Sequence, residues 1–247
     1  MPISVKDRVV IVTGGVGELG SVIARRLVEE GAKVVLADIQ DGAALEAELQ
    51  KIGTAKYVET DVGDEGSTLN MAAVTQETFG RIDVLINNAG IYTGKPFEEI
   101  TLEDWRERMR VNLDGAFLCV KAVLPAMKAQ QAGRIINIGS DTVWMGTPGL
   151  AHYVASKGGL LGLTRALATE LGPLGIKTVW ISPTLFDTPG TRQAFLQEHF
   201  DYVLSHTPIG KFETPEDVAG LVTFLCSDEA EFINGSAINI GGGISMH

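Results

Sequence analysis

Short aliphatic runs alternate along the chain with longer segments in which apolar residues recur every three or four positions. The runs predict strands at residues 9–12, 33–37, 56–59, 84–86, 134–138, 177–181 and 237–240. Because helical segments separate these runs, we expect parallel strands that are covered on both faces. The pattern therefore predicts one α/β domain over residues 1–247, built on a doubly wound, seven-stranded parallel sheet.

Helical periodicity and end signals predict five long helices, at residues 19–30, 64–79, 102–131, 153–171 and 214–225. The longest begins after Thr101, which has Asp104 three residues later as in a capping box. Residues 184–213 depart from the alternation, because they follow the sixth strand with several prolines and no strand of their own. A long segment at the carboxyl end of a strand predicts a substrate lid.

Composition narrows the class of protein. The chain has 20 Lys+Arg against 31 Asp+Glu, a net charge of −11, which argues against nucleic acid or an anionic membrane as a partner. Cys119 and Cys226 lie in apolar runs without metal-ligand spacing, so we expect buried thiols and no metal site. The first residues resemble neither a signal peptide nor a membrane span, so we expect a cytoplasmic protein.

A glycine-rich turn with Gly14, Gly15, Gly17 and Gly20 joins the first strand to the first helix. Such a turn frees backbone N–H groups and a helix N-terminus to bind a diphosphate. Asp38 ends the second strand, where a carboxylate accepts both hydroxyls of an adenosine ribose and repels a 2′-phosphate. No Arg or Lys lies in the turn or beside Asp38, so the sequence favours NAD(H) over NADP(H), with an ordinary exposed carboxylate as the alternative for Asp38.

Tyr153 and Lys157 lie four residues apart, which places both side chains on one face of a helix. A phenol with a pKa near ~10 exchanges protons poorly at neutral pH, but a neighbouring ammonium stabilises the phenolate. Ser140 comes thirteen residues before Tyr153 and just past the fifth strand, at the sheet edge where catalytic groups gather. These three residues form a candidate general acid/base site.

Separated motifs in the same order resemble those of the short-chain dehydrogenase/reductase family. They are the glycine turn, Asn87-Asn88-Ala89-Gly90 after the fourth strand, Asn112 between Val111 and Leu113, Ser140, and the Tyr153/Lys157 pair. The resemblance covers nearly the whole chain and implies a Rossmann-like fold. It also implies that Tyr153 passes the proton, that Lys157 lowers its pKa and holds the nicotinamide ribose, that Ser140 orients the reacting oxygen, and that Asn112 supports a proton relay.

The same resemblance implies the residues that hold the cofactor, with Asp61 and Val62 near the adenine and Thr188 and the Phe186 backbone near the carboxamide. The expected set is Gly14, Gly17, Leu19, Asp38, Asp61, Val62, Asn88, Ala89, Gly90, Tyr153, Lys157, Pro183, Phe186 and Thr188. Four positions depart from the family pattern. Glu18 and Thr184 stand where the family has glycine, Trp180 where it has asparagine, and Gly241 where it commonly has aspartate. Our hypothesis is that Glu18 weakens cofactor binding without abolishing it.

Substrate identity is less clearly encoded. Thr142, Trp144, Thr184 and Leu185 are expected to line a mostly apolar pocket, although Trp144 is equally compatible with ordinary packing. This pocket favours a hydrophobic or aryl secondary alcohol or ketone, and the relatives the chain resembles include dehydrogenases of 1-phenylethanol. The alternatives are an acyl-thioester (3-oxoacyl) ketoreductase, a weakly catalytic NAD-binding sensor and a cofactor-free lyase, which Lys157 and the glycine turn disfavour. The family's pairing of long helices implies a homotetramer.

Overall fold

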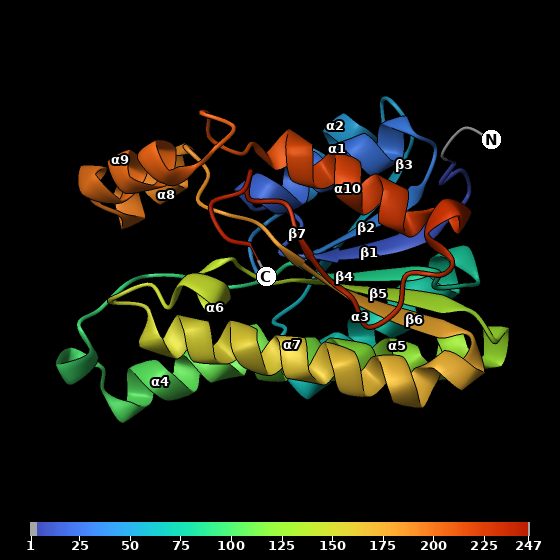
Figure 1. Cartoon of the computed structure of the whole chain (residues 1–247). Coiled ribbons are helices and arrows are strands. Elements are labelled where there is room, and N and C mark those ends of the chain that lie inside the picture. The colour runs from blue at the N-terminus through green and yellow to red at the C-terminus, as the bar shows by residue number, and fades with distance from the viewer. Residues whose placement is uncertain (1–3, 247) are drawn as a thin grey trace.

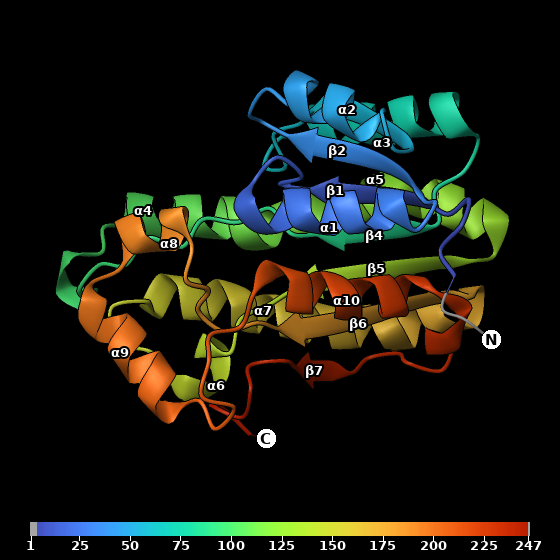
Figure 2. The same ribbon diagram turned by 90° about the horizontal axis from the view of Figure 1, so that it is seen from above.

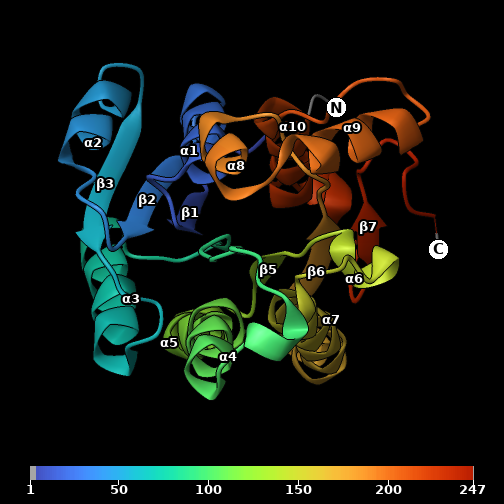
Figure 3. The ribbon, with the colours of Figure 1, turned by 90° about the vertical axis from the view of Figure 1, so that its left-hand side faces the viewer.

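The computed structural model describes residues 4–246 and confirms the seven-stranded parallel sheet, in the order β3-β2-β1-β4-β5-β6-β7 (Figures 1 and 3). The strands are β1 (Val9–Thr13), β2 (Lys33–Asp38), β3 (Thr54–Glu59), β4 (Val84–Asn87), β5 (Gly133–Ile138), β6 (Ile176–Ser182) and β7 (Ala237–Asn239). The strand order reverses between β1 and β4, and ligands of open α/β sheets bind beyond the strand ends at such a point.

Alternate residues of the central strands pack into two different cores. In β1, Val10 and Val12 belong to one cluster, whereas Ile11 belongs to the other. The helices α1 (Glu18–Glu29), α2 (Ala43–Leu49) and α10 (Pro215–Cys226) cover one face. The helices α3 (Glu65–Phe79), α5 (Gly115–Gln130) and α7 (Ala151–Leu171) cover the other (Figure 3). Cys119 and Cys226 are buried free thiols, one in each core.

The predicted helix over residues 102–131 is confirmed from Leu102 to Gln130, but it contains a π-helical turn that the apolar pattern does not indicate. The chain forms α4 (Leu102–Met109), a π-helical turn η2 (Arg110–Asp114) and then α5. The expected capping box is present, because the Thr101 side chain accepts from the Asp104 N–H and the Asp104 carboxylate accepts from the Thr101 N–H. A single π-turn adds one residue to the helical repeat and often marks a functional position. Here it carries Asn112.

Residues 184–213 contain two helices, α8 (Pro189–Ala194) and α9 (Gln197–His206), and no strand. Both lie beyond the carboxyl ends of the strands, together with α4 and the short α6 (Thr142–Met145) (Figure 2). The two ends of the segment are tied together, because the Thr184 N–H donates to Glu213 Oε2 at 2.7 Å. The segment therefore stands over the sheet edge where the candidate site residues gather.

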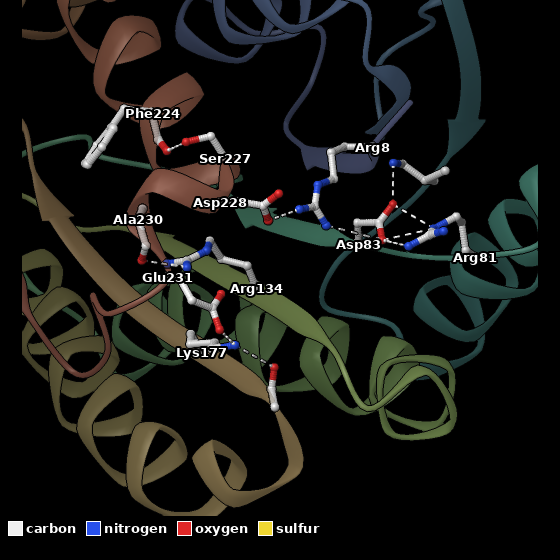
Figure 4. A network of polar contacts seen from close by, with 12 residues as sticks. Arg8, Arg81, Asp83, Arg134, Lys177, Phe224, Ser227, Asp228, Ala230 and Glu231 are labelled. Carbon is white, nitrogen blue, oxygen red and sulfur yellow. Dashed lines mark hydrogen bonds and ion pairs between the residues drawn. The ribbon is translucent and has the colours of Figure 1, made fainter. Parts of the chain in front are cut away.

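The opposite, amino edge of the sheet carries a network of ion pairs (Figure 4). Asp83, just before β4, accepts from Arg81 Nη2 at 2.6 Å and from the Val9 N–H at 2.8 Å. Arg134 in β5 donates to the carbonyls of Ala230 and Ile233 at 2.8 and 3.2 Å. This network fastens the strand starts to the turn after α10. Within residues 4–246, no helix is long and apolar enough to cross a membrane.

Candidate functional site

A cavity of about 1410 Å³ runs along the carboxyl edge of the sheet. Asp38 and Asp61 line one part of it, the glycine turn lines its floor, and Ser140, Tyr153 and Lys157 line the part beneath the lid segment. Ligand pockets for single small molecules measure ~300–1,000 Å³, so this cavity has room for a dinucleotide and a second small molecule. Predicted residues from seven separate stretches of sequence thus meet at one site.

The glycine turn is shaped by close backbone approaches. Gly14 has φ +61°, and a Cβ there would lie 2.9 Å from Ala89 Cα; at Gly20 a Cβ would lie 2.0 Å from the Gly14 carbonyl oxygen. Asn88 fixes the turn from β4, because its side-chain amide donates to the carbonyls of Thr13 and Gly14 at 2.9 and 3.0 Å. Only glycine fits at both positions without moving this backbone.

The N-terminus of α1 opens onto the cavity, because Gly17 occupies the N-cap position and no side chain caps the helix. Its first N–H groups remain available for an anion. The Glu18 carboxylate contacts the lid segment, since it accepts from Thr188 Oγ1 at 2.6 Å and from the Gly190 N–H at 2.8 Å. Glu18, which stands where the family has its middle glycine, thus joins the glycine turn to the start of α8.

Two carboxylates stand at the strand ends beside this turn. Asp38 is buried and accepts from the N–H groups of Val16 and Gln40, at 2.9 and 3.0 Å, so it also holds the glycine turn against β2. Asp61 accepts from Arg110 Nη1 at 3.1 Å. Each carboxylate has further lone pairs and lines the cavity. Arg110 is a cavity-lining residue that the sequence motifs did not indicate.

Tyr153 and Lys157 lie on the first two turns of α7, as their spacing predicts. Lys157 Nζ donates to the Ile138 carbonyl at 2.7 Å and lies 5.8 Å from the centre of the Tyr153 ring. Burial lowers the pKa of Lys157 to about 8, so most of the ammonium stays charged at neutral pH. Burial raises the pKa of Tyr153 to about 12, which outweighs the lowering by hydrogen bonding to Ser140. In the protein without ligand, the phenol therefore holds its proton.

Ser140 lines the cavity, whereas Asn112 is not among its lining residues. Ser140 Oγ accepts from Thr142 Oγ1 at 2.9 Å and remains on the cavity wall. Asn112 is buried in the π-turn, where its Nδ2 donates to the Ile91 carbonyl at 3.0 Å and its Oδ1 accepts from the Ile91 N–H at 2.9 Å. It therefore positions the loop after β4, and its Nδ2 also reaches Ser156 Oγ at 3.1 Å.

The predicted substrate residues divide into two groups. Thr142, Thr184 and Leu185 line the cavity. Trp144 is not among its lining residues; its indole packs edge-on against Trp180, with ring centres 5.6 Å apart. The lid segment supplies an aromatic wall in its place, because the Phe195 ring stacks on Tyr92 at 6.0 Å and both line the cavity.

The remaining cofactor residues from the resemblance are placed as follows. Leu19, Val62, Ala89, Gly90, Pro183 and Phe186 line the cavity with the glycine turn. Thr188 is not among the lining residues, and its hydroxyl is engaged by Glu18. Thr188 also caps α8 by accepting from the Thr191 N–H.

Several buried polar groups near the site had no motif to indicate them. Arg108 in α4 is buried against His152 in α7, with Nη2 and Nε2 3.3 Å apart. Asp141 and Glu213 are buried carboxyl groups whose pKa values burial raises, to about 6 and about 8 respectively. No signal in the sequence indicates these residues, because residues that meet across the fold lie far apart along the chain and form no short-range pattern.

These residues fit a nicotinamide dinucleotide. The glycine turn leaves the α1 N-terminus uncapped for a diphosphate, and Asp38 reaches the same cavity as Tyr153 and Lys157. The cavity that joins these groups is also lined by small or apolar residues, among them Gly17, Leu19 and Gly90. When bound, such a cofactor would accept a hydride from an alcohol in its oxidised form and would donate one to a ketone in its reduced form.

Comparisons with known proteins agree with this geometry. A family model described as Enoyl-(Acyl carrier protein) reductase matches residues 15–245. The chain is 35% identical to the (2S)-[(R)-hydroxy(phenyl)methyl]succinyl-CoA dehydrogenase subunit BbsD of Thauera aromatica, over 98% of each chain. It is 38% identical to meso-2,3-butanediol dehydrogenase of Serratia marcescens, over 96% of this chain and 94% of that protein.

Among solved structures, 3-ketoacyl-(acyl-carrier-protein) reductase from Brucella melitensis, complexed with NADH, is similar with a TM-score of 0.91 and 31% identity. The match covers 98% of this chain and all of that one. These similarities extend over the whole sheet and every motif of the site. The chain belongs to the short-chain dehydrogenase/reductase family of nicotinamide-dependent oxidoreductases.

Proposed function

We propose that the protein transfers a hydride between NAD(H) and a hydrophobic or aryl secondary alcohol or its ketone. The observation that carries the proposal is the placement of the Tyr153/Lys157 pair in the same cavity as the uncapped glycine turn and Asp38. Tyr153 gives its proton to the ketone oxygen, and Ser140 hydrogen-bonds that oxygen. Lys157 stabilises the resulting phenolate by its charge, and Asn112 holds the loop that borders the site.

The preference for NAD over NADP rests on Asp38. Its carboxylate is buried at the end of β2 and is followed by Ile39 and Gln40, neither of which neutralises it. A 2′-phosphate would meet this charge, whereas ribose hydroxyls can donate to it. We expect NADH to bind at least ~10-fold more tightly than NADPH, because one unfavourable charge contact costs at least about 1.4 kcal/mol.

The substrate class rests on the wall opposite Tyr153. Leu185, Phe195 and Tyr92 offer mainly apolar and aromatic surface there. The Thauera aromatica relative is named for a phenyl-bearing carbinol, which supports an aryl substrate. That name also contains a CoA thioester, and with the Brucella reductase it supports an acyl-thioester ketone as the second candidate. The cavity offers few cations to a CoA phosphate, since Arg110 and Lys157 are its only arginine and lysine among the described residues.

A spectrophotometric panel tests the proposal. NADH oxidation is followed with aryl, alkyl and acyl-thioester ketones, for the wild-type protein and Tyr153→Phe. We expect turnover on aryl or hydrophobic ketones and its loss in the variant. Turnover only on thioesters would favour the second candidate. Binding of NADH without turnover on any ketone would overturn the catalytic assignment and indicate a sensor.

We also propose that the protein assembles as a homotetramer through its long helices. Large apolar side chains are exposed on α4 and α5, including Trp105 and Phe117, as expected of a surface that another copy covers. Light scattering at micromolar concentration tests the assembly, and a monomeric mass would contradict it. We place the protein in the cytoplasm, on the basis of its acidic composition and buried reduced cysteines.

A further inference from the structure

A buried arginine packs beside the helix that carries Tyr153 and Lys157. Arg108 is 4% exposed and lies in the last turn of α4, where that helix packs against α7. Its Nη2 donates to the carbonyl and the hydroxyl of Thr93, both at 2.9 Å, and lies 3.3 Å from His152 Nε2. Its Nε and Nη1 are buried and have no hydrogen-bond partner. This is an unusual environment for a charge, because buried cations are normally paired.

The acidic residues near Arg108 are engaged elsewhere. Asp104 forms an ion pair with Lys95 at 2.7 Å, and Glu107 forms one with Arg110 at 2.8 Å. Among residues 4–246, no carboxylate forms an ion pair with Arg108 itself. The guanidinium stays charged because arginine keeps its proton even when burial lowers its pKa. Asp104 and Glu107 still stabilise this charge electrostatically, but neither forms an ion pair with it.

The groups that face this charge belong to the catalytic site. His152 directly precedes Tyr153 on α7, and burial and Arg108 both lower the pKa of His152, so the imidazole is neutral and can accept from the guanidinium. Arg108 also lowers the pKa of Tyr153, against burial, Asp141 and Tyr92, which raise it. For Lys157, burial lowers the pKa first and Arg108 lowers it further.

We propose that Arg108 is a positioning residue of the reaction, a buried cation with two unpartnered nitrogens that favours the deprotonated phenol of Tyr153 and orients the start of α7 through His152. The inference rests on the proposed role of Tyr153 as the proton donor. Arg108 does not line the cavity, so it acts on the phenol through space and not on the substrate. Its charge acts in the same direction as that of Lys157, toward the phenolate that accepts the hydroxyl proton when an alcohol is oxidised.

Two titrations test the inference, one of which needs no substrate. The pKa of Lys157 is followed by NMR of labelled lysine side chains, and the pH profile of kcat/KM for alcohol oxidation reports the essential base. We expect Arg108→Met to raise both pKa values by about half a unit or more, less than the ~1–3 units typical of a charge in direct contact. Arg108→Lys keeps the charge and should restore both values to within about 0.3 unit.

Matched controls separate charge from structure. Arg106→Gln removes the same charge from an exposed position on α4, and Thr93→Ala removes an acceptor of Arg108 but leaves the cation. Both should leave the two titrations unchanged. If Arg108→Met does not fold, Arg108→Gln, which can still donate to Thr93, takes its place.

Unchanged titrations of folded Arg108→Met, or equal shifts in Arg106→Gln, would overturn the inference. The NMR titration of Lys157 still tests the electrostatic role of Arg108 if the protein turns over no ketone. A shift in Lys157 together with an inactive enzyme would therefore count against the proposed function and not against the electrostatic role of Arg108.

Discussion

Buried charged groups are fully paired at one edge of the sheet and incompletely paired at the other. At the amino edge, Asp83 accepts from two side-chain nitrogens of Arg81 and from a backbone N–H, and Arg134 donates to two carbonyls (Figure 4). At the carboxyl edge, Arg108 keeps two unpaired nitrogens, and Glu213 keeps an unpaired Oε1. Paired charges hold a fold together, whereas perturbed proton affinities gather at functional sites. Burial shifts the pKa values of Arg108 and Glu213, and their unpaired atoms lie at the edge that carries the candidate site.

Removing the charge of Lys157 should produce the largest effect. Lys157→Met removes the cation beside Tyr153 and the bond to the Ile138 carbonyl, so kcat should fall by about 10²–10⁴-fold. Lys177→Met is the control at the amino edge, where Lys177 pairs with Glu231 far from the cavity. It should leave kcat within about twofold, and stopped-flow NADH oxidation measures both. Similar losses in the two variants would contradict the division between edges.

Weakening the ion-pair network at the amino edge should lower the free energy of unfolding and leave kcat unchanged. Asp83 is 2% exposed in its side chain, and Asp83→Asn weakens its bonds to Arg81 and leaves buried polar atoms poorly paired. We expect a loss of about 2 kcal/mol in the free energy of unfolding, below the ~3–5 kcal/mol of a fully buried pair because Arg81 is half exposed. Urea unfolding measures the loss. The folded variant should retain the wild-type kcat, and a tenfold fall at unchanged folding would count against the comparison.

Much of the fold and of the catalytic site could be predicted from the sequence because the determining patterns are local. The alternation of β1 and the spacing of Tyr153 and Lys157 both depend on a few neighbouring residues. The helix over residues 102–131 was predicted, but its π-turn was not, because a π-turn changes the backbone without interrupting the apolar periodicity. That turn directs Asn112 at the loop after β4.

The pairings across the fold could not be predicted. Glu18 and Gly190 are 172 positions apart, and Arg108 and His152 are 44 apart. Nothing in either local sequence indicates its partner. For Glu18 the sequence predicted a charge that disturbs a phosphate site, and the structure adds the lid contact that occupies its carboxylate.

Glu213 should make stability depend on pH. Burial raises its pKa from 4.5 to about 8, so the folded state binds a proton that the unfolded state releases. Stability from this group is full below about pH 4.5 and falls as the pH rises toward about 8. Glu213→Gln should flatten the decline in Tm over this range, whereas Glu216→Gln, at an exposed position, should preserve it. Thermal melts across pH measure this, and an unchanged slope in Glu213→Gln would refute the assignment.

The contact of Glu18 with the lid segment should have the smallest effect. Glu18→Gln weakens the bonds to Thr188 and Gly190, which frees the Thr188 hydroxyl and removes a negative charge from the glycine turn. We expect NADH to bind about 2- to 5-fold more tightly, since exposed charged contacts contribute up to ~1 kcal/mol. Fluorescence titration measures the Kd, with Glu29→Gln at the far end of α1 as the control. Weaker binding in Glu18→Gln would mean that the contact helps to form the site.

The central claim is that the carboxyl edge performs proton transfer through Tyr153 while NADH is bound. Its most direct test is a single-turnover experiment, in which preformed protein–NADH complex is mixed with an aryl methyl ketone. The account predicts rapid NADH oxidation by the wild-type protein and a rate at least about 10²-fold lower for Tyr153→Phe, with NADH affinity unchanged within about twofold. Equal rates in the two proteins would contradict it.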